Sequence, residues 1–241
     1  MLEDIHAVDL LIDLLGRHRK RRLTQYDPAV RHIGQQAQLL ADAIAAARKV
    51  DAVVFIGGLN KGDHQDSEGA DRLQLGLPYG QDAVIGALAE ANPNLAVVFV
   101  SGNAVAMPWI DRVPAVLEAW YSGSEAGNAL ADVLFGAVNP SGKLPFTFPV
   151  RLEDCSAHSA GEYPGEGQVV YRDGIFVGYR WIEKERIEPL FAFGHGLSYT
   201  TFDIANVRAD RTSLATTGRL RVSADVTNTG GRAGAEVVQL Y

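Results

Sequence analysis

The sequence predicts a layered α/β fold with a mostly parallel sheet, followed by an antiparallel β-sandwich that is only begun. Two apolar, β-branched runs at 51–58 and 94–101 alternate with helical patterns, which is typical of strands whose faces are covered by helices. After residue 139 the chain becomes rich in Gly, Pro and aromatic residues. Residues 220–226 alternate strictly between apolar and polar types, as a half-exposed antiparallel strand does.

The elements can be assigned in chain order. Apolar residues at helical spacing predict helices over 5–15, 28–49, 80–91 and 127–135. Continuous apolar runs predict buried parallel strands over 51–57 and 95–101, and 113–121 is a third candidate strand. Residues 140–198 are expected to form ordered loops and a few short strands around this α/β layer. Beyond residue 202 two or three strands are expected, among them 220–226, a hairpin turn at 228–231 and a strand at 235–241.

Composition limits the classes of partner. The 241 residues carry a net charge of −7, which argues against nucleic acid, and they contain no apolar run long enough to cross a membrane. The basic run 17–22 is interpreted as a solvated charge run, with a nuclear signal as the alternative. Cys155 is the single cysteine, so no intrachain disulfide is possible, and nothing here assigns a cellular compartment.

The richest polar segment is the loop 59–77, which directly follows the first predicted strand. Ligands of open α/β sheets gather at this edge. Three interpretations stay open on the residues alone: a solvated loop, a metal site of Asp63, His64 and Asp66, or a carboxylate acid/base site. The metal interpretation lacks a second His or Cys at ligand spacing. Gly57-Gly58 lacks the spacing of a dinucleotide fingerprint, so no metal and no cofactor is predicted.

Several long motifs, in order, resemble glycoside hydrolase family 3. The match covers roughly residues 35–241 and rests on the segments 65–72, 77–78, 101–109, 119–136, 139–149, 174–180, 189–199, 226–230 and 234–241. The last two segments are similar to the opening of the fibronectin-III-like domain that often follows in that family. The resemblance therefore divides the chain into a segment 1–23 without family counterpart, an α/β sandwich domain 24–198 and a truncated fibronectin-III-like domain 199–241.

The resemblance implies part of a retaining β-glycosidase of β-glucosidase type that acts on a β-linked glucoside or oligosaccharide. In the family a barrel domain supplies an aspartate nucleophile in a Ser-Asp-Trp-like motif, and the α/β sandwich lends a glutamate acid/base from the loop matched here. That assigns the role to Glu68, in agreement with the two carboxyl groups that a retaining mechanism requires. Asp71 and Arg72 are expected either to form an ion pair that orients the loop or to touch the substrate.

The sequence departs from the family pattern at decisive places. It contains no Ser-Asp-Trp motif, and the first sandwich strand and its glycine-serine-rich loop are not recognisable. A barrel domain is therefore expected as the partner needed for activity. The alternative is a non-catalytic fragment, or a carbohydrate-binding or interaction module. Trp109, Trp120 and Trp181 lie in apolar runs and are expected to pack in the core rather than to stack on sugars.

Overall fold

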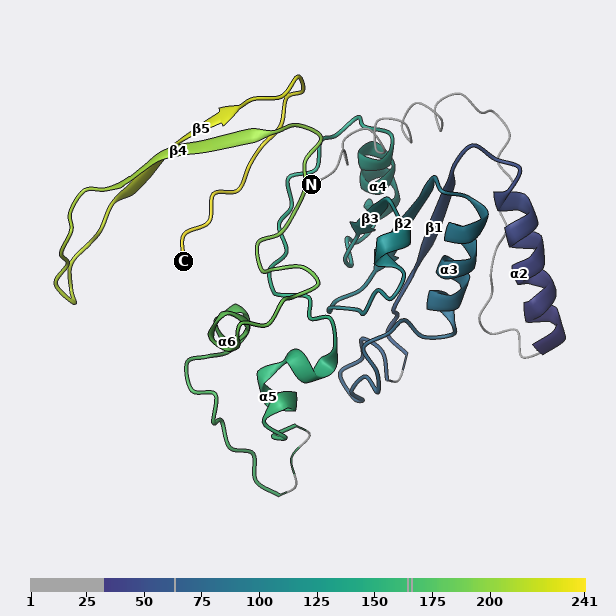
Figure 1. Ribbon diagram of the computed structural model, residues 1–241, viewed down its shortest axis with the longest axis horizontal. Helices are drawn as coiled ribbons and strands as arrows, with labels where there is room; N and C mark the ends of the chain where they lie inside the picture. Colours follow the sequence, from purple (N-terminus) through teal and green to yellow (C-terminus); the bar gives the residue numbers. More distant parts are fainter. Residues whose placement is uncertain (1–32, 63, 164, 166) are drawn as a thin grey trace.

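The computed structural model describes residues 33–62, 64–163, 165 and 167–241 and shows an α/β body from which a two-stranded ribbon projects (Figure 1). The body contains α2 (Ile33–Ala47), β1 (Val53–Gly58), α3 (Gln81–Ala91), β2 (Leu95–Val100), the 3₁₀ turn η1 (Ile110–Arg112), β3 (Ala115–Glu118) and α4 (Ala126–Leu134). The chain continues through η2 (Leu152–Asp154), α5 (Ser156–Ser159), α6 (Tyr179–Glu185), β4 (Phe202–Ala209) and β5 (Val222–Asn228).

The strands β1, β2 and β3 form one parallel sheet in that order. Val53 pairs with Leu95 at the start of the first ladder, and Val98 pairs with Leu117 in the second. Helix α3 connects β1 to β2 and crosses one face of the sheet, and α2 packs beside α3 (Figure 1). The predicted parallel strands and the predicted helices at 80–91 and 127–135 are confirmed. The predicted helix at 5–15, the expected loose packing of 1–23 and the start of the helix at 28–49 lie outside the described residues.

The expectation that the strands at 51–57 and 95–101 are buried is correct for β2 and wrong for β1. All side chains from Leu95 to Phe99 are at most 3% exposed, because β2 has a neighbour on each side. Ile56 of β1 is 62% exposed, because β1 is the edge strand of the described sheet. A continuous apolar run does not distinguish an edge strand from a central one, since both contain the same residue types.

The hydrophobic core lies on the sheet face that carries Val97 and Phe99, and helix α3 covers it with Ile85 and Leu88. The turns after β2 add Val105, Met107 and Trp109, and the segment after α4 adds Phe148. Phe148 stacks on Phe146 and contacts Phe191 edge to face. The Gly- and Pro-rich region 140–198 therefore packs against the core through its aromatic rings. This packing makes the region after α4 part of the α/β body rather than a separate unit.

The region 140–198 is more helical than expected. The short strands predicted there are absent from its described residues, apart from an isolated antiparallel bridge between Phe148 and Phe191. Instead the short helices η2, α5 and α6 interrupt ordered loops. The predicted loops are confirmed, and the predicted strands are wrong because the sequence signal of aromatic residues between prolines reports packing onto a core, not ladder pairing.

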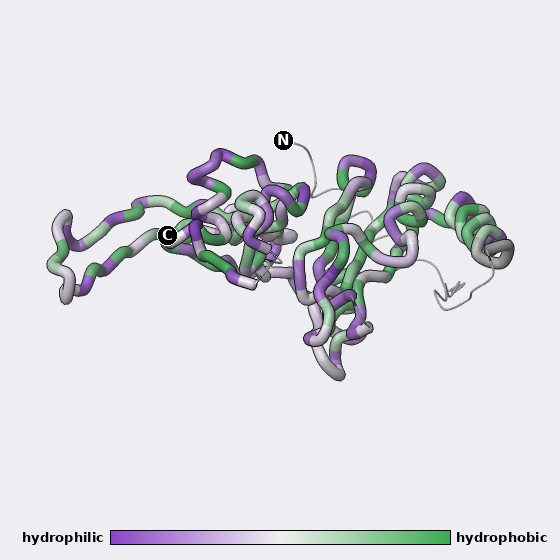
Figure 2. Tube along the Cα trace, turned by 90° about the horizontal axis from the view of Figure 1, so that it is seen from below, coloured by the Kyte–Doolittle hydropathy of each residue, from purple (hydrophilic) through white to green (hydrophobic). Residues whose placement is uncertain are grey.

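The ribbon consists of β4 and β5, paired antiparallel from Phe202↔Asn228 to Ala209↔Val222 with an irregularity between Ala205 and Arg208. Hydrophilic and hydrophobic segments alternate along it in Figure 2, as expected for strands with two different faces. The strand predicted at 220–226 is confirmed, with its bounds shifted to Val222–Asn228. The predicted hairpin at 228–231 is wrong: β5 pairs back onto β4 through a longer connection, and 235–241 is extended without a ladder partner among the described residues.

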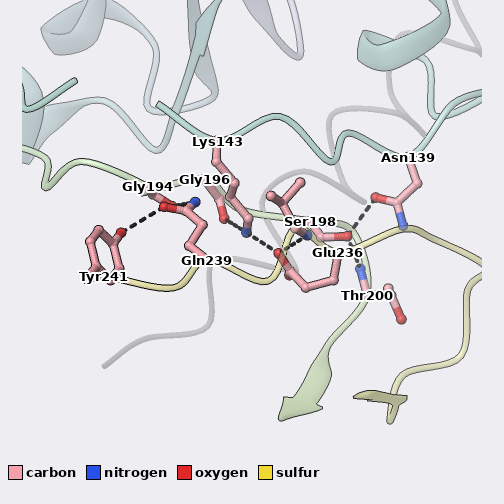
Figure 3. Close-up of polar contacts among 10 residues, drawn as sticks. Asn139, Lys143, Gly194, Gly196, Ser198, Thr200, Glu236, Gln239 and Tyr241 are labelled. Atoms are coloured by element: carbon pink, nitrogen blue, oxygen red, sulfur yellow. Dashed lines mark hydrogen bonds and ion pairs between the residues drawn. The ribbon is translucent and has the colours of Figure 1, made fainter. Parts of the chain in front are cut away.

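The extended C-terminal segment instead runs along the α/β body and is held by polar contacts (Figure 3). Lys143 is central, because its Nζ donates to the Gly196 carbonyl at 2.6 Å and lies 2.8 Å from Glu236 Oε1. Asn139 joins the same segments: its Oδ1 accepts from the Tyr199 amide at 2.7 Å and its Nδ2 donates to the Ala233 carbonyl at 3.0 Å. The segments 139–143 and 194–200 thus form the surface on which the C-terminal segment lies.

Candidate active site

Three loops meet at the carboxyl edge of the sheet, where β1, β2 and β3 end. The longest is the polar loop 59–77 after β1, and it leaves the sheet at Gly58 with a φ of 128°. A Cβ atom at this position would overlap the backbone of Val100, so the close approach of the two strand ends requires glycine. The loop predicted to lie at this edge is therefore confirmed in its place.

Two buried glutamines fix the beginning of the loop. Gln81, the first residue of α3, accepts from the Gly58 amide at 2.8 Å and donates to the Gly58 carbonyl at 2.8 Å. Gln65 accepts from the Asn60 amide at 3.0 Å and donates to the Tyr79 hydroxyl at 2.7 Å. Because buried polar groups are costly unless bonded, these contacts select one course for the loop.

The middle of the loop is bound to the turns after the other two strands. Asp66 Oδ2 accepts from the Gly102 amide at 2.6 Å and from the Tyr121 hydroxyl at 2.8 Å. Arg72 donates to the Ala104 carbonyl at 2.6 Å and to the Leu75 carbonyl at 2.7 Å. The loop after β1 is thus anchored to the turn after β2 on both sides of Glu68.

The three residues singled out from the sequence lie in this loop but do not form one cluster. Glu68 is exposed and is held by no hydrogen bond among the described residues. Arg72 is half-buried, and burial lowers the pKa of its guanidinium while the Asp66 charge opposes that shift. Asp71 is exposed and accepts a hydrogen bond from Tyr163, which raises the pKa of that phenol. Within the described part of the chain, Asp71 and Arg72 do not pair with each other, so the expected ion pair between them is not formed.

Beneath the loop lies a carboxylate that the sequence analysis did not single out, Glu118 at the end of β3. Burial raises its pKa to about 7, while hydrogen bonds from the Trp120 amide (2.9 Å) and the Ser101 hydroxyl (3.0 Å) oppose the shift. The nearby Asp66 charge raises the pKa further. The pKa of Tyr121 is raised as well, by partial burial and by its bond to Asp66. Glu118 is therefore the group below the loop whose charge changes near neutral pH.

This shift predicts a pH-dependent stability that depends on Glu118. A carboxyl whose pKa is higher in the folded than in the unfolded chain binds more protons when folded, so the contribution of Glu118 to the free energy of unfolding falls as pH rises from about 4.5 to about 7. We expect Glu118→Gln to remove about 1–2 kcal/mol of this decline, less than the full shift implies because the group keeps partial solvent contact. Urea unfolding of both chains across this pH range measures the difference. If the free energy of unfolding changed with pH equally in the parent chain and in Glu118→Gln, the raised pKa of Glu118 would be contradicted.

Glu118, Ser101 and Tyr121 escaped the sequence analysis, although their segments were recognised as strands. The signal that would have found them is positional: the carboxyl ends of parallel strands meet at one edge. Applied to β2 and β3 as well as to β1, that rule selects the residues that follow each strand.

No group of three metal-ligating side chains occurs within 33–62, 64–163, 165 and 167–241. Of the alternative metal set, Asp63 lies outside the described residues and His64 bonds to the Asp71 carbonyl. No helix of the described residues is long and apolar enough to cross a membrane.

Comparison with protein families places the chain that forms this layer. A profile of the glycosyl hydrolase family 3 C-terminal domain matches residues 13–199, and the chain belongs to this family. The match begins inside the segment 1–23 that the sequence analysis set apart, and it ends one residue beyond the boundary at 198.

Curated relatives and solved structures agree. The chain is 51% identical over 203 residues to β-glucosidase BoGH3A of Bacteroides ovatus and 46% identical over 209 residues to thermostable β-glucosidase B of Acetivibrio thermocellus. These alignments cover 83% and 86% of the chain but 27% of each relative. The β-glucosidase DesR of Streptomyces venezuelae, solved in complex with D-glucose, superposes with a TM-score of 0.77 at 42% identity, over 84% of this chain and 25% of that one. The family 3 β-glucosidase of Bifidobacterium adolescentis gives 0.73 at 38% identity, over 86% and 29%.

Proposed function

We propose that this chain supplies the general acid/base, Glu68, of a retaining β-glucosidase. The observation that carries the proposal is the presentation of Glu68: an exposed carboxyl group on a loop that is anchored on both sides at the carboxyl edge of the sheet. The β-glucosidase names of the relatives support the reaction class. The chain spans about a quarter of their length, so the enzyme that we propose includes further chain.

In this reaction Glu68 acts twice. As an acid it protonates the glycosidic oxygen while a second carboxylate, about 5–5.5 Å away, attacks the anomeric carbon. As a base it then takes a proton from the water that hydrolyses the glycosyl-enzyme. From the resemblance we infer that this second carboxylate belongs to a barrel domain. An exposed Glu68 is suited to this arrangement, because a barrel mouth facing the loop would bury it and favour its protonated form.

The substrate that we propose is a β-linked glucoside, and the barrel domain is the partner. We assign Asp71 and Arg72 different places relative to it. The Arg72 guanidinium is committed to the carbonyls of Ala104 and Leu75, so we propose that it supports the loop. Asp71 is exposed on the same loop and is the better candidate for a sugar hydroxyl, since carboxylates accept hydrogen bonds from such groups. We keep 24–198 and 199–241 as the proposed domain limits.

A domain exchange tests the proposal. The chain replaces the matching quarter of the Bacteroides ovatus relative, and the exchanged enzyme is assayed on aryl β-glucosides beside this chain alone. We expect turnover from the exchanged enzyme and none from the isolated chain, because an acid/base group by itself contributes only about 10²–10⁴-fold. A folded exchanged enzyme that binds glucose and cleaves no β-glucoside would favour the non-catalytic alternative.

A further inference from the structure

To act as a general acid, Glu68 must be held in a defined position, and an exposed loop residue is not held in place by its own side chain. A general acid must lie within hydrogen-bond reach of the oxygen that it protonates, and a misplacement of about 1 Å costs on the order of 10²-fold in rate. Glu68 has no hydrogen bond among the described residues that would fix its position. Its place must therefore be set by the backbone of its neighbours in the loop.

The strongest restraint on that backbone is two residues away. Asp66 uses a single oxygen, Oδ2, to accept from both the Gly102 amide (2.6 Å) and the Tyr121 hydroxyl (2.8 Å). The Asp66 amide donates to the Asn60 carbonyl at 3.0 Å. One side chain thus joins the ends of all three parallel strands, since the loop follows β1, Gly102 follows β2 and Tyr121 follows β3. Such charge-assisted bonds are stronger than those between neutral groups.

The residue opposite Asp66 is fitted to this contact. A Cβ atom at Gly102 would lie 3.2 Å from Tyr121 Cε2, which is a tight contact, and 3.4 Å from Asp66 Oδ2, so a larger residue would require the Tyr121 ring to shift slightly. Arg72 fixes the other side of Glu68 through the Ala104 and Leu75 carbonyls. The glycine, the shared oxygen and the arginine leave the chain between Asp66 and Arg72 little freedom to move relative to the sheet.

We propose that Asp66 and Tyr121 are positioning residues that place Glu68 for acid/base chemistry by binding its loop to the turns after β2 and β3. The inference rests on the proposed function of Glu68 and extends it to two side chains that do not themselves touch the reacting atoms. An amide oxygen in place of Oδ2 can accept both bonds, although more weakly than a carboxylate, and an amide nitrogen in place of Oδ1 would lose the contact from Asn103 Nδ2, which lies 3.5 Å from Oδ1. The role therefore requires first an acceptor at this position, and the negative charge strengthens the bonds that the acceptor makes.

The test compares Asp66→Ala, Asp66→Asn and Tyr121→Phe in the exchanged β-glucosidase, with Asp111→Asn, an exposed carboxylate of η1, as the control. We expect Asp66→Ala to lower kcat on alkyl β-glucosides about 10–100-fold with KM little changed, because the displaced acid still faces bound substrate. Asp66→Asn should restore part of that loss, and Tyr121→Phe should lose less activity than Asp66→Ala. The control should equal the parent enzyme.

Hydrogen exchange on this chain gives a readout that does not depend on activity. We expect the amides of 60–72 to exchange faster in Asp66→Ala and Tyr121→Phe, and those of 95–100 in β2 to stay as slow as in the parent chain. Equal kcat and equal exchange in Tyr121→Phe, which deletes one hydroxyl and preserves the ring, would overturn the proposal even if Asp66→Ala did not fold. So would an Asn variant as impaired as the Ala variant, since the role would then be one of charge.

Two further outcomes separate this inference from the function on which it rests. If azide restores turnover of Asp66→Ala and leaves Glu68→Ala unchanged, Asp66 is itself the acid/base, and both proposals fail. If the exchanged enzyme is inactive in every form while exchange at 60–72 responds as expected, the loop is anchored as described but the β-glucosidase function is wrong.

Discussion

Glu68→Ala in the exchanged β-glucosidase is expected to lower turnover of alkyl β-glucosides by about 10²–10⁴-fold, the usual contribution of general acid/base catalysis. Aryl glucosides with acidic leaving groups should be cleaved to the glycosyl-enzyme at a nearly normal rate, because their oxygen needs little protonation. The second step should then limit turnover, since no base activates water. Added azide needs no base, and it should raise kcat and yield the β-glycosyl azide.

The measurement pairs steady-state rates on the two substrate classes with product analysis after azide addition. Glu90→Ala is the matched control, because Glu90 is an exposed glutamate of α3 whose surface ion pair with Arg112 contributes little to stability. It should behave as the parent enzyme. An equal loss on both substrate classes, without azide product, would remove Glu68 from the acid/base role.

The α/β layer was predictable from the sequence because its signals are local. The runs 51–57 and 95–101 are apolar over a strand's length, and the helical pattern at 80–91 separates them by the distance of a crossover connection. Two strands joined by a crossover helix are expected to pair in parallel. The loop at the end of the first strand then followed from the direction of the chain alone, and with it the location of Glu68.

The errors concern features that depend on partners distant in sequence. Ile56 is exposed because of where β1 lies in the sheet, and a run of apolar residues does not encode that place. The turn at 228–231 has a hairpin composition, yet β5 pairs with β4 and the following segment is bound by Lys143 and Asn139. Local turn propensity was overridden there by contacts with the α/β body.

The candidate site was only partly predictable for the same reason. Glu68 stands in a recognisable motif, whereas Glu118 and Tyr121 lie in an apolar segment that is explained equally well as a buried strand. Their relation to the loop depends on the register between β2 and β3, which places Phe99 beside Glu118 and so brings the two strand ends together. The pKa of Glu118 follows from burial in that assembled edge, which no local pattern reports.

The tryptophans offer the sharpest test of the packing that supports this edge. Trp109 is 1% exposed, and its Nε1 donates to Asp82 Oδ1 at 2.8 Å. Asp82 Oδ2 also accepts from the Leu77 amide, so the indole and the end of the loop 59–77 share one carboxylate. Burial raises the pKa of Asp82, and the indole bond opposes this shift. Trp109 thus joins the core to the loop in addition to filling space.

We expect Trp109→Ala to lower the free energy of unfolding by about 3–5 kcal/mol, the usual loss for a buried aromatic residue. Trp109→Phe should cost about 1–3 kcal/mol, because it retains most of the packing and leaves the Asp82 carboxylate short of a donor. Trp181→Phe is the matched control: the Trp181 indole nitrogen is buried without a partner among the described residues, so removing it sacrifices no hydrogen bond. Lys184 keeps a ring beneath its ammonium in that variant. Urea unfolding of the three variants measures the order, and an equal loss in the two Phe variants would show that the bond from Trp109 to Asp82 contributes nothing beyond packing.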